Sequence, residues 1–402
     1  MINFWLKKMT KKISRHNVVT RNNDVYSGKQ DLELVHTIKK MPIKMGATTQ
    51  NINDDEYLDL NCYISISSGM LQISPLIALD KLYSNGHGAG TVGKTWQKHH
   101  SEFSKIIKHY SPKTILEIGG GHGRLAKINL SSNNKTSLWK ILEPSFNSFE
   151  TTNDPRIEYE KGYFNKSFIE NCNLYDAIVH SHLLEHIYDP NNFIKLSRKI
   201  LTAEGFVILS VPNIKYMLKN KYCNAIMFEH SYYATEYYIK SMFEKNGFKL
   251  DKKTYFQNHS IFMVFKKSVS KIDKILKFEG LFERNKKIYL TYINTLKSFV
   301  DKTNLILEKN NDMNSFYLFG AHIFSQILLS LGLNSKKIRF VIDNDINKTE
   351  KRLYGSNLIV KSSEILKADT EPIIILNAGN YNKEIKDKII NKYCKTAKFL
   401  EI

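Results

Sequence analysis

The feature that most constrains this sequence is a glycine-rich turn in residues 114–126, which read Thr-Ile-Leu-Glu-Ile-Gly-Gly-Gly-His-Gly-Arg-Leu-Ala. Ile115, Leu116 and Ile118 predict a buried strand, and the apolar residues after the last glycine predict the start of a helix. Glycines between a strand and a helix let a ligand approach bare backbone amides at the positive end of the helix. The turn therefore predicts a ligand site, and by itself it would suit a phosphate, a carboxylate or a nucleoside.

Two acidic residues narrow the choice of ligand. Glu117 sits inside the turn, where a carboxylate favours a cationic or hydroxyl-bearing ligand over a pyrophosphate. A second short strand, residues 138–143, ends in Glu143, about twenty residues past the glycines, where nucleoside-binding α/β units place the carboxylate that takes the ribose hydroxyls. Together these residues favour an adenosine ligand without phosphates.

Length and charge limit the class of protein. A chain of 402 residues is too long for one ordinary core, so two or three domains are expected, and a hydrophobic content of 42% indicates folded protein. The net charge is +20, but the lysines are spread along the chain rather than clustered with aromatic residues as in nucleic-acid-binding proteins. We therefore expect no nucleic-acid partner, whereas an anionic small substrate suits the charge.

The four cysteines are isolated and form no CxxC pair: Cys62, Cys172, Cys223 and Cys394. This pattern predicts neither a disulfide framework nor a zinc knuckle, and it fits a reducing cytoplasm. No apolar run approaches the roughly 20 residues of a membrane span, and the apolar patch at the N-terminus is too short for a signal peptide. A cytoplasmic protein without a membrane span is expected.

The chain before the glycine turn divides into two segments. Residues 1–82 hold short apolar runs separated by turn residues, a pattern typical of a small β-rich domain. Residues 83–96 hold four glycines and lead into the next predicted helix. We interpret this segment as a ligand loop, and a plain glycine-rich linker is the alternative.

Residues 112–265 alternate strands with helices, which predicts a doubly wound sheet with ligands at the carboxyl ends of its strands. A histidine-rich loop follows the strand at 177–179 and ends at Pro190, where a helix opens. The next strand covers residues 205–213. Both the glycine turn and the histidine-rich loop therefore fall at the edge of the sheet where ligands bind.

After a connecting segment, the C-terminal part of the chain again alternates strands with helices. Residues 268–312 carry apolar residues at spacings of three and four, typical of an amphipathic helix. Residues 313–402 contain a strand at 338–343 that ends in an acid, but they lack the glycine triplet. A structural or substrate-clamping Rossmann-like domain is therefore favoured over a second cofactor site.

Four short motifs follow one another along the chain: Glu117-Ile-Gly-Gly-Gly-His-Gly, Leu142-Glu-Pro-Ser, Leu184-Glu-His-Ile-Tyr-Asp-Pro and Ser210-Val-Pro-Asn. With these motifs the chain resembles the class I S-adenosylmethionine-dependent methyltransferases. The segment Phe228-Glu-His-Ser-Tyr-Tyr and the C-terminal domain are similar to the three-domain C-methyltransferases that act on nucleotide-linked keto-sugars. That family usually binds zinc through four cysteines of its N-terminal domain, but only Cys62 stands in that region here.

The resemblance implies an α/β fold with a central Rossmann-like methyltransferase domain, a small β-rich N-terminal domain and a second Rossmann-like domain at the C-terminus. It also implies S-adenosylmethionine as cofactor and a degenerate zinc-binding domain without its metal. The predicted boundaries are 1–82 for the N-terminal domain, 83–267 for the methyltransferase domain, 268–312 for the helical connector and 313–402 for the C-terminal domain.

The resemblance also implies a set of cofactor contacts. Glu117 would face the ammonium of the cofactor, and Glu143 would take both ribose hydroxyls, with a solvated strand end as the alternative for Glu143. Phe164 would border the adenine and His182 would lie below the cofactor, and core packing is the alternative for both. The full set is Glu117, Gly119, Gly120, Gly121, Glu143, Pro144, Phe164 and His182.

Methylation of carbon requires a base, because a C–H next to a ketone becomes nucleophilic only as its enolate. A histidine titrates near neutral pH and suits this step. By resemblance, His230 is the base, Glu229 its orienting neighbour, and Tyr83 with Tyr232 the donors to the oxyanion. The substrate contacts expected from the loop and the following helix are His87, Trp96 and His99.

Other functions stay open at this point. The first is O-methylation of a sugar or phosphoramidate-type hydroxyl in capsule or polysaccharide biosynthesis, with His87, His99 or His100 as possible replacements for the base. The second is a non-catalytic protein that binds nucleotide-sugars or serves as a scaffold. An oxidoreductase that uses the C-terminal unit is disfavoured, since that unit lacks the pyrophosphate glycines. The sequence leaves the sugar, the methylated atom, the nucleotide carrier and the oligomeric state undetermined.

Overall fold

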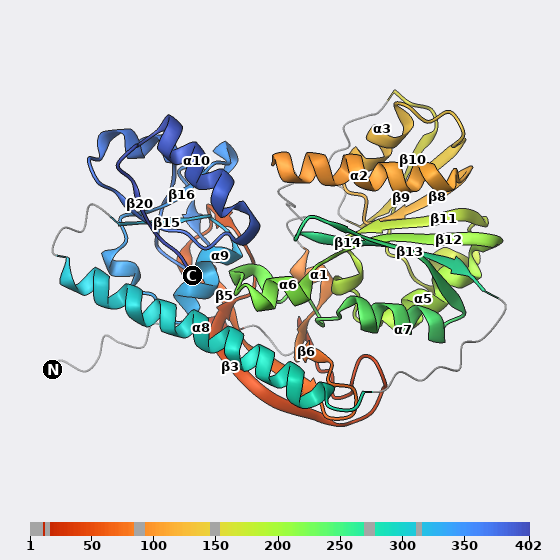
Figure 1. Cartoon of the computed structure of the whole chain (residues 1–402), viewed down its shortest axis with the longest axis horizontal. Helices are drawn as coiled ribbons and strands as arrows, with labels where there is room; N and C mark the ends of the chain where they lie inside the picture. Colours follow the sequence, from red (N-terminus) through yellow and green to blue (C-terminus); the bar gives the residue numbers. More distant parts are fainter. Residues whose placement is uncertain (1–10, 13–16, 84–92, 145–152, 269–277, 311–315) are drawn as a thin grey trace.

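The largest sheet of the protein has seven strands in the order β10-β9-β8-β11-β12-β14-β13. The computed structural model describes residues 11–12, 17–83, 93–144, 153–268, 278–310 and 316–402 (Figure 1). The strands from β10 to β12 are parallel, and β14 runs antiparallel between β12 and β13. The strands are β8 (Thr114–Ile118), β9 (Leu138–Glu143), β10 (Ile157–Lys161), β11 (Tyr175–Ser181), β12 (Leu201–Pro212), β13 (Phe248–Phe256) and β14 (Ser260–Lys267).

Helices cover both faces of this sheet (Figure 1). Successive side chains of a strand point to opposite faces, and in β8 Ile115 joins the core under α2 and α3 whereas Leu116 joins the core under α5 and α7. The chain order reverses between β8 and β11, so a ligand crevice is expected at their carboxyl ends. The helices are α2 (Lys94–Tyr110) and α3 (Arg124–Leu130) on one face, and α4 (Lys166–Glu170), α5 (Pro190–Lys199) and α7 (Glu236–Lys245) on the other.

The N-terminal part is rich in β-structure, as its turn-punctuated sequence predicts. Its centre is a long antiparallel pair, β3 with β5, and β6 adds to β5. Cys62 lies on β5 and is fully buried, and burial raises the pKa of its thiol to about 12, so it is a neutral core residue. The elements are β1 (Lys11–Lys12), β2 (Val18–Val19), β3 (Leu32–Pro42), β4 (Ala47–Thr48), η2 (Ile52–Asp54), β5 (Glu56–Ser65), β6 (Leu71–Ile73), β7 (Leu76–Ile77) and α1 (Leu79–Leu82).

The C-terminal part contains a second, fully parallel sheet in the order β18-β16-β15-β19-β20. It follows the long helix α8 (Leu281–Lys309), which corresponds to the amphipathic connector expected from the sequence. The elements are β15 (Phe316–Phe319), α9 (Ile323–Ser330), η6 (Ser335–Lys337), β16 (Phe340–Asp343), η7 (Ile346–Lys348), β17 (Arg352–Leu353), β18 (Val360–Ser362), η8 (Ser363–Ala368), β19 (Ile373–Ile375), η9 (Gly379–Tyr381), α10 (Asn382–Lys392) and β20 (Lys398–Leu400).

These two Rossmann-like sheets confirm the predicted α/β fold class. They also share a local geometry. In each sheet, the second strand in sequence order (β9 or β16) ends in a carboxylate, which accepts a hydrogen bond from the turn after the first strand (β8 or β15). Glu143 accepts from the Gly121 amide at 3.2 Å, and Asp343 accepts from the Ala321 amide at 2.8 Å. Within the described residues, none of the helices combines the length and the apolar character needed to cross a membrane.

One continuous apolar core joins the N-terminal sheet to the C-terminal sheet through α6 (Ile214–Lys219) and α8. The two terminal parts also form direct contacts, because β17 pairs antiparallel with β4. The N-terminal part reaches the methyltransferase-like sheet as well, through an isolated bridge between Gln72 and Tyr232. The three parts therefore pack against one another around the region where the candidate site lies.

Candidate functional site

The glycine turn forms the floor of the site at the carboxyl end of β8. Gly119 and Gly121 have φ values of +72° and +52°, a conformation that residues with a Cβ rarely adopt. Gly120 is required for another reason, because a Cβ there would lie 2.7 Å from Glu117 Cδ and 2.9 Å from Ile141 Cγ2. Among the described residues, no atom lies within 4 Å of where a Cβ on Gly121 would stand, so they leave that side of the main chain open.

Glu117 lies beneath this turn. It belongs to β8 rather than to the turn itself, its exposed fraction is 3%, and its Oε2 accepts a hydrogen bond from the Trp139 indole at 2.8 Å. Burial raises the pKa of Glu117 to about 7, the Trp139 hydrogen bond opposes this rise and the charge of Glu143 adds to it. The carboxyl group therefore supports the turn from below in this structure.

Glu143 ends β9 beside the open face of Gly121. Its Oε2 accepts the Gly121 amide at 3.2 Å, and a carboxylate can accept further hydrogen bonds from a diol. Pro144 follows it and is partly exposed. A turn of glycine amides suits the methionine part of S-adenosylmethionine and an adjacent carboxylate suits its ribose hydroxyls, so the described residues fit this cofactor.

The other two predicted cofactor contacts, Phe164 and His182, are partly buried. Phe164 packs against Phe168 and Phe193, with ring centroids 5.9 and 5.1 Å apart. His182 follows β11 with a φ of +50°, and its Nε2 lies 2.8 Å from Ser260 Oγ. Burial lowers the pKa of His182 well below its ordinary value, with further lowering by neighbouring histidines, so this ring is neutral.

The helix that follows the glycine-histidine loop brings Trp96 and His99 to the same edge. Trp96 lies edge-on to His182 with ring centroids 4.9 Å apart. His99 is fully buried, with its Nε2 2.8 Å from Ser210 Oγ, and burial lowers its pKa to about 2. The expected role of His99 as a substrate contact is corrected by this placement, since the ring belongs to the interior. His87, the third expected contact, lies outside the described residues.

The C-terminal part also reaches this edge. Tyr381 in η9 has its hydroxyl 3.1 Å from Nε2 of His259, which in turn lies edge-on to Trp96 at 4.9 Å. A side chain from the second Rossmann-like unit therefore borders the candidate cofactor region.

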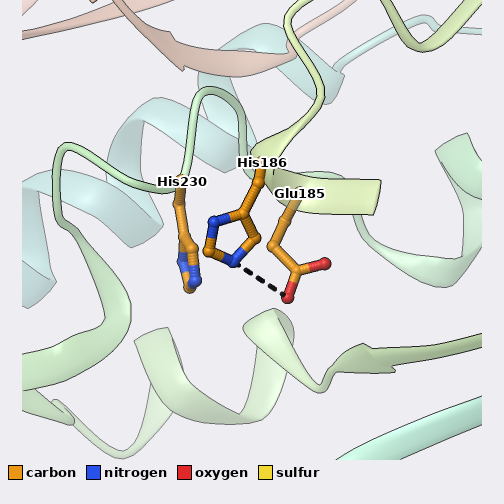
Figure 2. A group of neighbouring side chains, drawn as sticks. All are labelled: Glu185, His186 and His230. Atoms are coloured by element: carbon orange, nitrogen blue, oxygen red, sulfur yellow. Dashed lines mark ion pairs between the residues drawn. The ribbon is translucent and has the colours of Figure 1, made fainter. Parts of the chain in front are cut away.

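A second cluster lies on two loops beside the carboxyl ends of β11 and β12 (Figure 2). Glu185 and His186 lie in η3 (Leu184–His186), and His230 comes from the loop between η4 (Cys223–Ala225) and α7. Figure 2 shows the His186 ring between His230 and Glu185, with 5.2 Å between the histidine centroids and 3.8 Å between His186 Nε2 and Glu185 Oε1. Tyr83, which caps α1, has its hydroxyl 2.8 Å from His186 Nδ1.

This cluster is largely removed from solvent. His230 is 8% exposed, and it borders a cavity of about 20 Å³ together with Glu185, Tyr232 and Tyr233. A cavity of this size holds about one water molecule. Burial raises the pKa of Tyr83 well above its ordinary value, and the nearby Glu229 and Glu185 raise it further, so the hydroxyl keeps its proton at neutral pH.

The structure changes the role of one predicted neighbour. Tyr232 is 1% exposed and its hydroxyl donates to the Leu184 carbonyl at 2.7 Å, so its hydrogen is already used, and the expected donation to an oxyanion is corrected to a supporting role. Glu229 Oε2 lies 3.9 Å from His186 Nδ1, so this carboxylate also belongs to the cluster. Its expected role as the orienting neighbour of His230 stays a prediction.

Sequence reasoning missed His186 and Glu185. Both belong to the quoted motif Leu184-Glu-His-Ile-Tyr-Asp-Pro, and the signal was their position directly after a strand's carboxyl end. The three side chains Glu185, His186 and His230 each offer one possible ligand atom, and these atoms lie within 4.8 Å of one another. Such a set could hold a divalent cation as well as move a proton.

Comparisons with known protein families match two parts of the chain. Residues 91–253 match the family model of a methyltransferase domain, and residues 257–401 match that of a C-methyltransferase C-terminal domain. No curated protein matches the sequence.

Solved structures that resemble part of this chain include three methyltransferases. The 1,6-didemethyltoxoflavin-N1-methyltransferase of Burkholderia thailandensis is 12% identical, with 50% of this chain and 97% of that chain covered and a TM-score of 0.37. An S-adenosylmethionine-dependent methyltransferase of Mesorhizobium loti is 12% identical, with coverages of 45% and 99% and a TM-score of 0.34. An O-methyltransferase family protein of B. thailandensis is 12% identical with a TM-score of 0.36, and the match spans 43% of this chain and 57% of that chain.

Proposed function

We propose that this chain, which its two domain matches make an S-adenosylmethionine-dependent methyltransferase, transfers the methyl group to a carbon atom of a nucleotide-linked keto-sugar. S-adenosylmethionine is the cofactor, and when bound it supplies an electrophilic methyl group. The match to a C-methyltransferase C-terminal domain supports carbon rather than oxygen as the acceptor. The net charge of +20 suits a substrate that carries phosphates.

The observation that carries this proposal is the meeting of Tyr83, His186 and His230 in one cluster, where the Tyr83 hydroxyl lies 2.8 Å from His186 Nδ1 and the two histidine ring centroids are 5.2 Å apart. In the proposed reaction His230 removes a proton from the carbon next to the ketone, and the electron pair of that C–H bond forms the enolate. Tyr83 donates its hydroxyl hydrogen to the enolate oxygen when His186 Nδ1 carries a proton, because Tyr83 then accepts from His186. Two carboxyl groups, Glu185 and Glu229, lie 3.8 and 3.9 Å from the ring nitrogens of His186, so both are placed to pair with this ring when it is protonated.

Positioning and exclusion of water account for much of the rate in this proposal. The Tyr83 side chain is partly buried, and that of His230 is 8% exposed. A reacting carbon held close to both groups would gain from orientation and from the low dielectric of this largely buried cluster. The glycine turn would hold the methionine part of the cofactor, and Glu143 would hold its ribose hydroxyls, at the neighbouring edge.

The substrate can be identified by mass spectrometry of nucleotide-linked keto-sugars and polysaccharide fragments after incubation with enzyme and S-adenosylmethionine. We expect a gain of one methyl group on a nucleotide-linked keto-sugar. In deuterated solvent without cofactor, we expect exchange at the acceptor carbon, because only an enolate route opens that C–H bond. Methyl gain without such exchange, on a hydroxyl group, would support O-methylation instead.

The base can be tested with a matched pair of histidine variants. His230→Ala should lower kcat by about 100-fold or more, the usual contribution of a positioned general base, and should abolish the exchange. His109→Ala, at an exposed position near the end of α2, serves as the control and should retain activity. Full activity of the His230 variant would refute the assignment of the base.

A chelator separates proton transfer from metal catalysis in the same cluster. If His230 acts as a base, EDTA should leave turnover unchanged, and added Zn²⁺ should inhibit because it competes for the imidazole lone pair. Loss of activity in EDTA, with recovery on adding a metal, would assign Glu185, His186 and His230 to a metal centre instead.

A further inference from the structure

The N-terminal domain inserts one arginine between the two loops that carry the candidate catalytic residues. Arg21 follows β2, and its guanidinium donates to the Tyr188 carbonyl at 2.6 Å and to the Ser231 carbonyl at 2.9 Å. Tyr188 lies two residues past His186, and Ser231 directly follows His230. One planar side chain thus spans the backbone of both loops.

The two loops have further contacts that converge on the same place. The Ser231 amide donates to the Glu185 carbonyl at 2.9 Å, and the Ser231 hydroxyl donates to the Ile187 carbonyl at 3.0 Å. Strand β6 of the N-terminal domain donates from the Ile73 amide to the Ser231 carbonyl at 3.3 Å. Ser231 therefore receives hydrogen bonds from both Arg21 and β6, and its position depends on the N-terminal domain.

The acceptors of the guanidinium indicate what it does. Burial lowers the pKa of Arg21, and the nearby groups Tyr232, Tyr188, Asp189 and Asp24 oppose this change. A guanidinium stays charged in proteins, and a buried charge is costly unless its donors are satisfied. The Arg21 guanidinium donates to the main-chain carbonyls of Ser231 and Tyr188. These hydrogen bonds therefore hold the backbone in position rather than neutralise a carboxylate. The backbone itself is anchored, because the Arg21 amide donates to Ser74 Oγ at 3.1 Å.

We propose that Arg21 is a positioning residue, through which the N-terminal domain sets the distance between His186 and His230. The inference rests on the proposed function of these two histidines. It assigns a role in the reaction to the N-terminal domain, residues 1–82, which lies before Tyr83 and the other residues of the cluster in the sequence. A lysine cannot replace this residue, because a single ammonium cannot reproduce the planar fork that reaches two carbonyls.

The experiment compares Arg21→Ala and Arg21→Lys with a matched control, Arg198→Ala. Arg198 also donates its guanidinium to two main-chain carbonyls, those of Gly247 and Ser268, but it lies away from the two histidine loops. Hydrogen exchange in peptides covering residues 182–189 and 226–234 reports on the loops without any substrate. We expect faster exchange in both peptides in each Arg21 variant, and unchanged exchange there in the Arg198 variant.

Turnover of the methyl acceptor found by mass spectrometry gives the second readout. We expect kcat to fall about 100-fold in Arg21→Ala, as for a small misplacement of reacting groups, with the affinity for S-adenosylmethionine in calorimetry unchanged. Free guanidinium ion at millimolar concentration should restore part of kcat in Arg21→Ala and none in Arg198→Ala. A structural role alone would not predict this selective rescue.

Three outcomes would overturn the proposal. These are unchanged exchange in either loop, equal losses of activity in the Arg21 and Arg198 variants, and absence of guanidinium rescue in a folded Arg21→Ala protein. If Arg21→Ala does not fold, Arg21→Lys carries the same exchange and kcat tests. Failure of the base assignment would be recognised separately, because it is measured on His230→Ala.

Discussion

Glu117 illustrates how one residue can be found from the sequence while its environment cannot. The sequence predicts a carboxylate at the glycine turn, and the structure places this carboxylate under the turn, almost fully buried against Trp139. Its orientation toward the ammonium of the cofactor stays a prediction. The raised pKa of Glu117 follows from burial, which depends on the packing of β8 against β9.

This burial predicts a pH dependence of stability in the cofactor-free protein. The pKa of Glu117 rises from 4.5 to about 7 on folding, so the folded state binds the proton more tightly than the unfolded state. The contribution of Glu117 is therefore fully present below about pH 4.5 and is lost as pH rises through about 7, a loss of about 3 kcal/mol in the free energy of unfolding. Urea denaturation between pH 4.5 and 8 should show this fall in the wild type and not in Glu117→Gln.

The Glu143→Gln variant is the control for this measurement. It removes the neighbouring charge but keeps the buried carboxyl, and burial is the largest cause of the shift, so most of the fall should remain. Parallel curves for the wild type and Glu117→Gln would contradict the prediction.

At the scale of elements, the strand-turn-helix unit β8-α3 was predicted well because its signals are local. Apolar alternation defines the strand, and each glycine is required by a positive φ or by a close contact. No separate strands are expected from the sequence of residues 248–267, where the structure has the antiparallel pair β13 and β14. Pairing at that edge of the sheet depends on contacts with β12, which a single sequence does not display.

The glycine turn predicts a specific effect of adding one methyl group. Gly120→Ala should lower the free energy of unfolding by about 1–3 kcal/mol, because its Cβ would lie 2.7 Å from Glu117 Cδ and would overpack the turn. The same shift of the main chain should weaken binding of S-adenosylmethionine at least about tenfold in calorimetry.

Gly93→Ala is the matched control for this substitution. A Cβ on Gly93, at the start of α2, would meet no atom of the described residues within 4 Å, and its φ of −75° is accessible to alanine. Equal affinity of the Gly120→Ala and Gly93→Ala variants for S-adenosylmethionine would contradict the prediction that close packing at Gly120 is needed for binding.

At the scale of the whole molecule, the N-terminal and C-terminal parts are joined by a buried ion pair. Arg352 donates to both oxygens of Asp55 at 2.6 Å, and the Gly355 amide adds a hydrogen bond at 2.7 Å. The Asp55 side chain is fully buried and that of Arg352 is 10% exposed. This contact lies beside the β4-β17 pairing, so it holds together segments about 300 residues apart in sequence.

Removing one partner of this pair should be more damaging than removing both. Arg352→Met leaves the Asp55 carboxylate buried without its counterion, and the free energy of unfolding should fall by about 3–5 kcal/mol in urea denaturation. The double variant Asp55→Leu with Arg352→Met should lose much less, since no buried charge remains. Equal losses in the single and double variants would show that the charge itself is not the cause.

The sequence by itself determined the class of fold, the glycine turn and the two acids that border it, because these depend on local periodicity and on fixed spacings within one α/β unit. Only the tertiary structure decided which side chains form the candidate catalytic cluster. Tyr83 and His186 are 103 residues apart, yet their side chains lie 2.8 Å from each other. In the tertiary structure His99 is fully buried, and the Tyr232 hydroxyl donates a hydrogen bond to the Leu184 carbonyl. The physical reason is that burial and hydrogen-bond partners arise from packing between segments far apart in sequence, which no local pattern records.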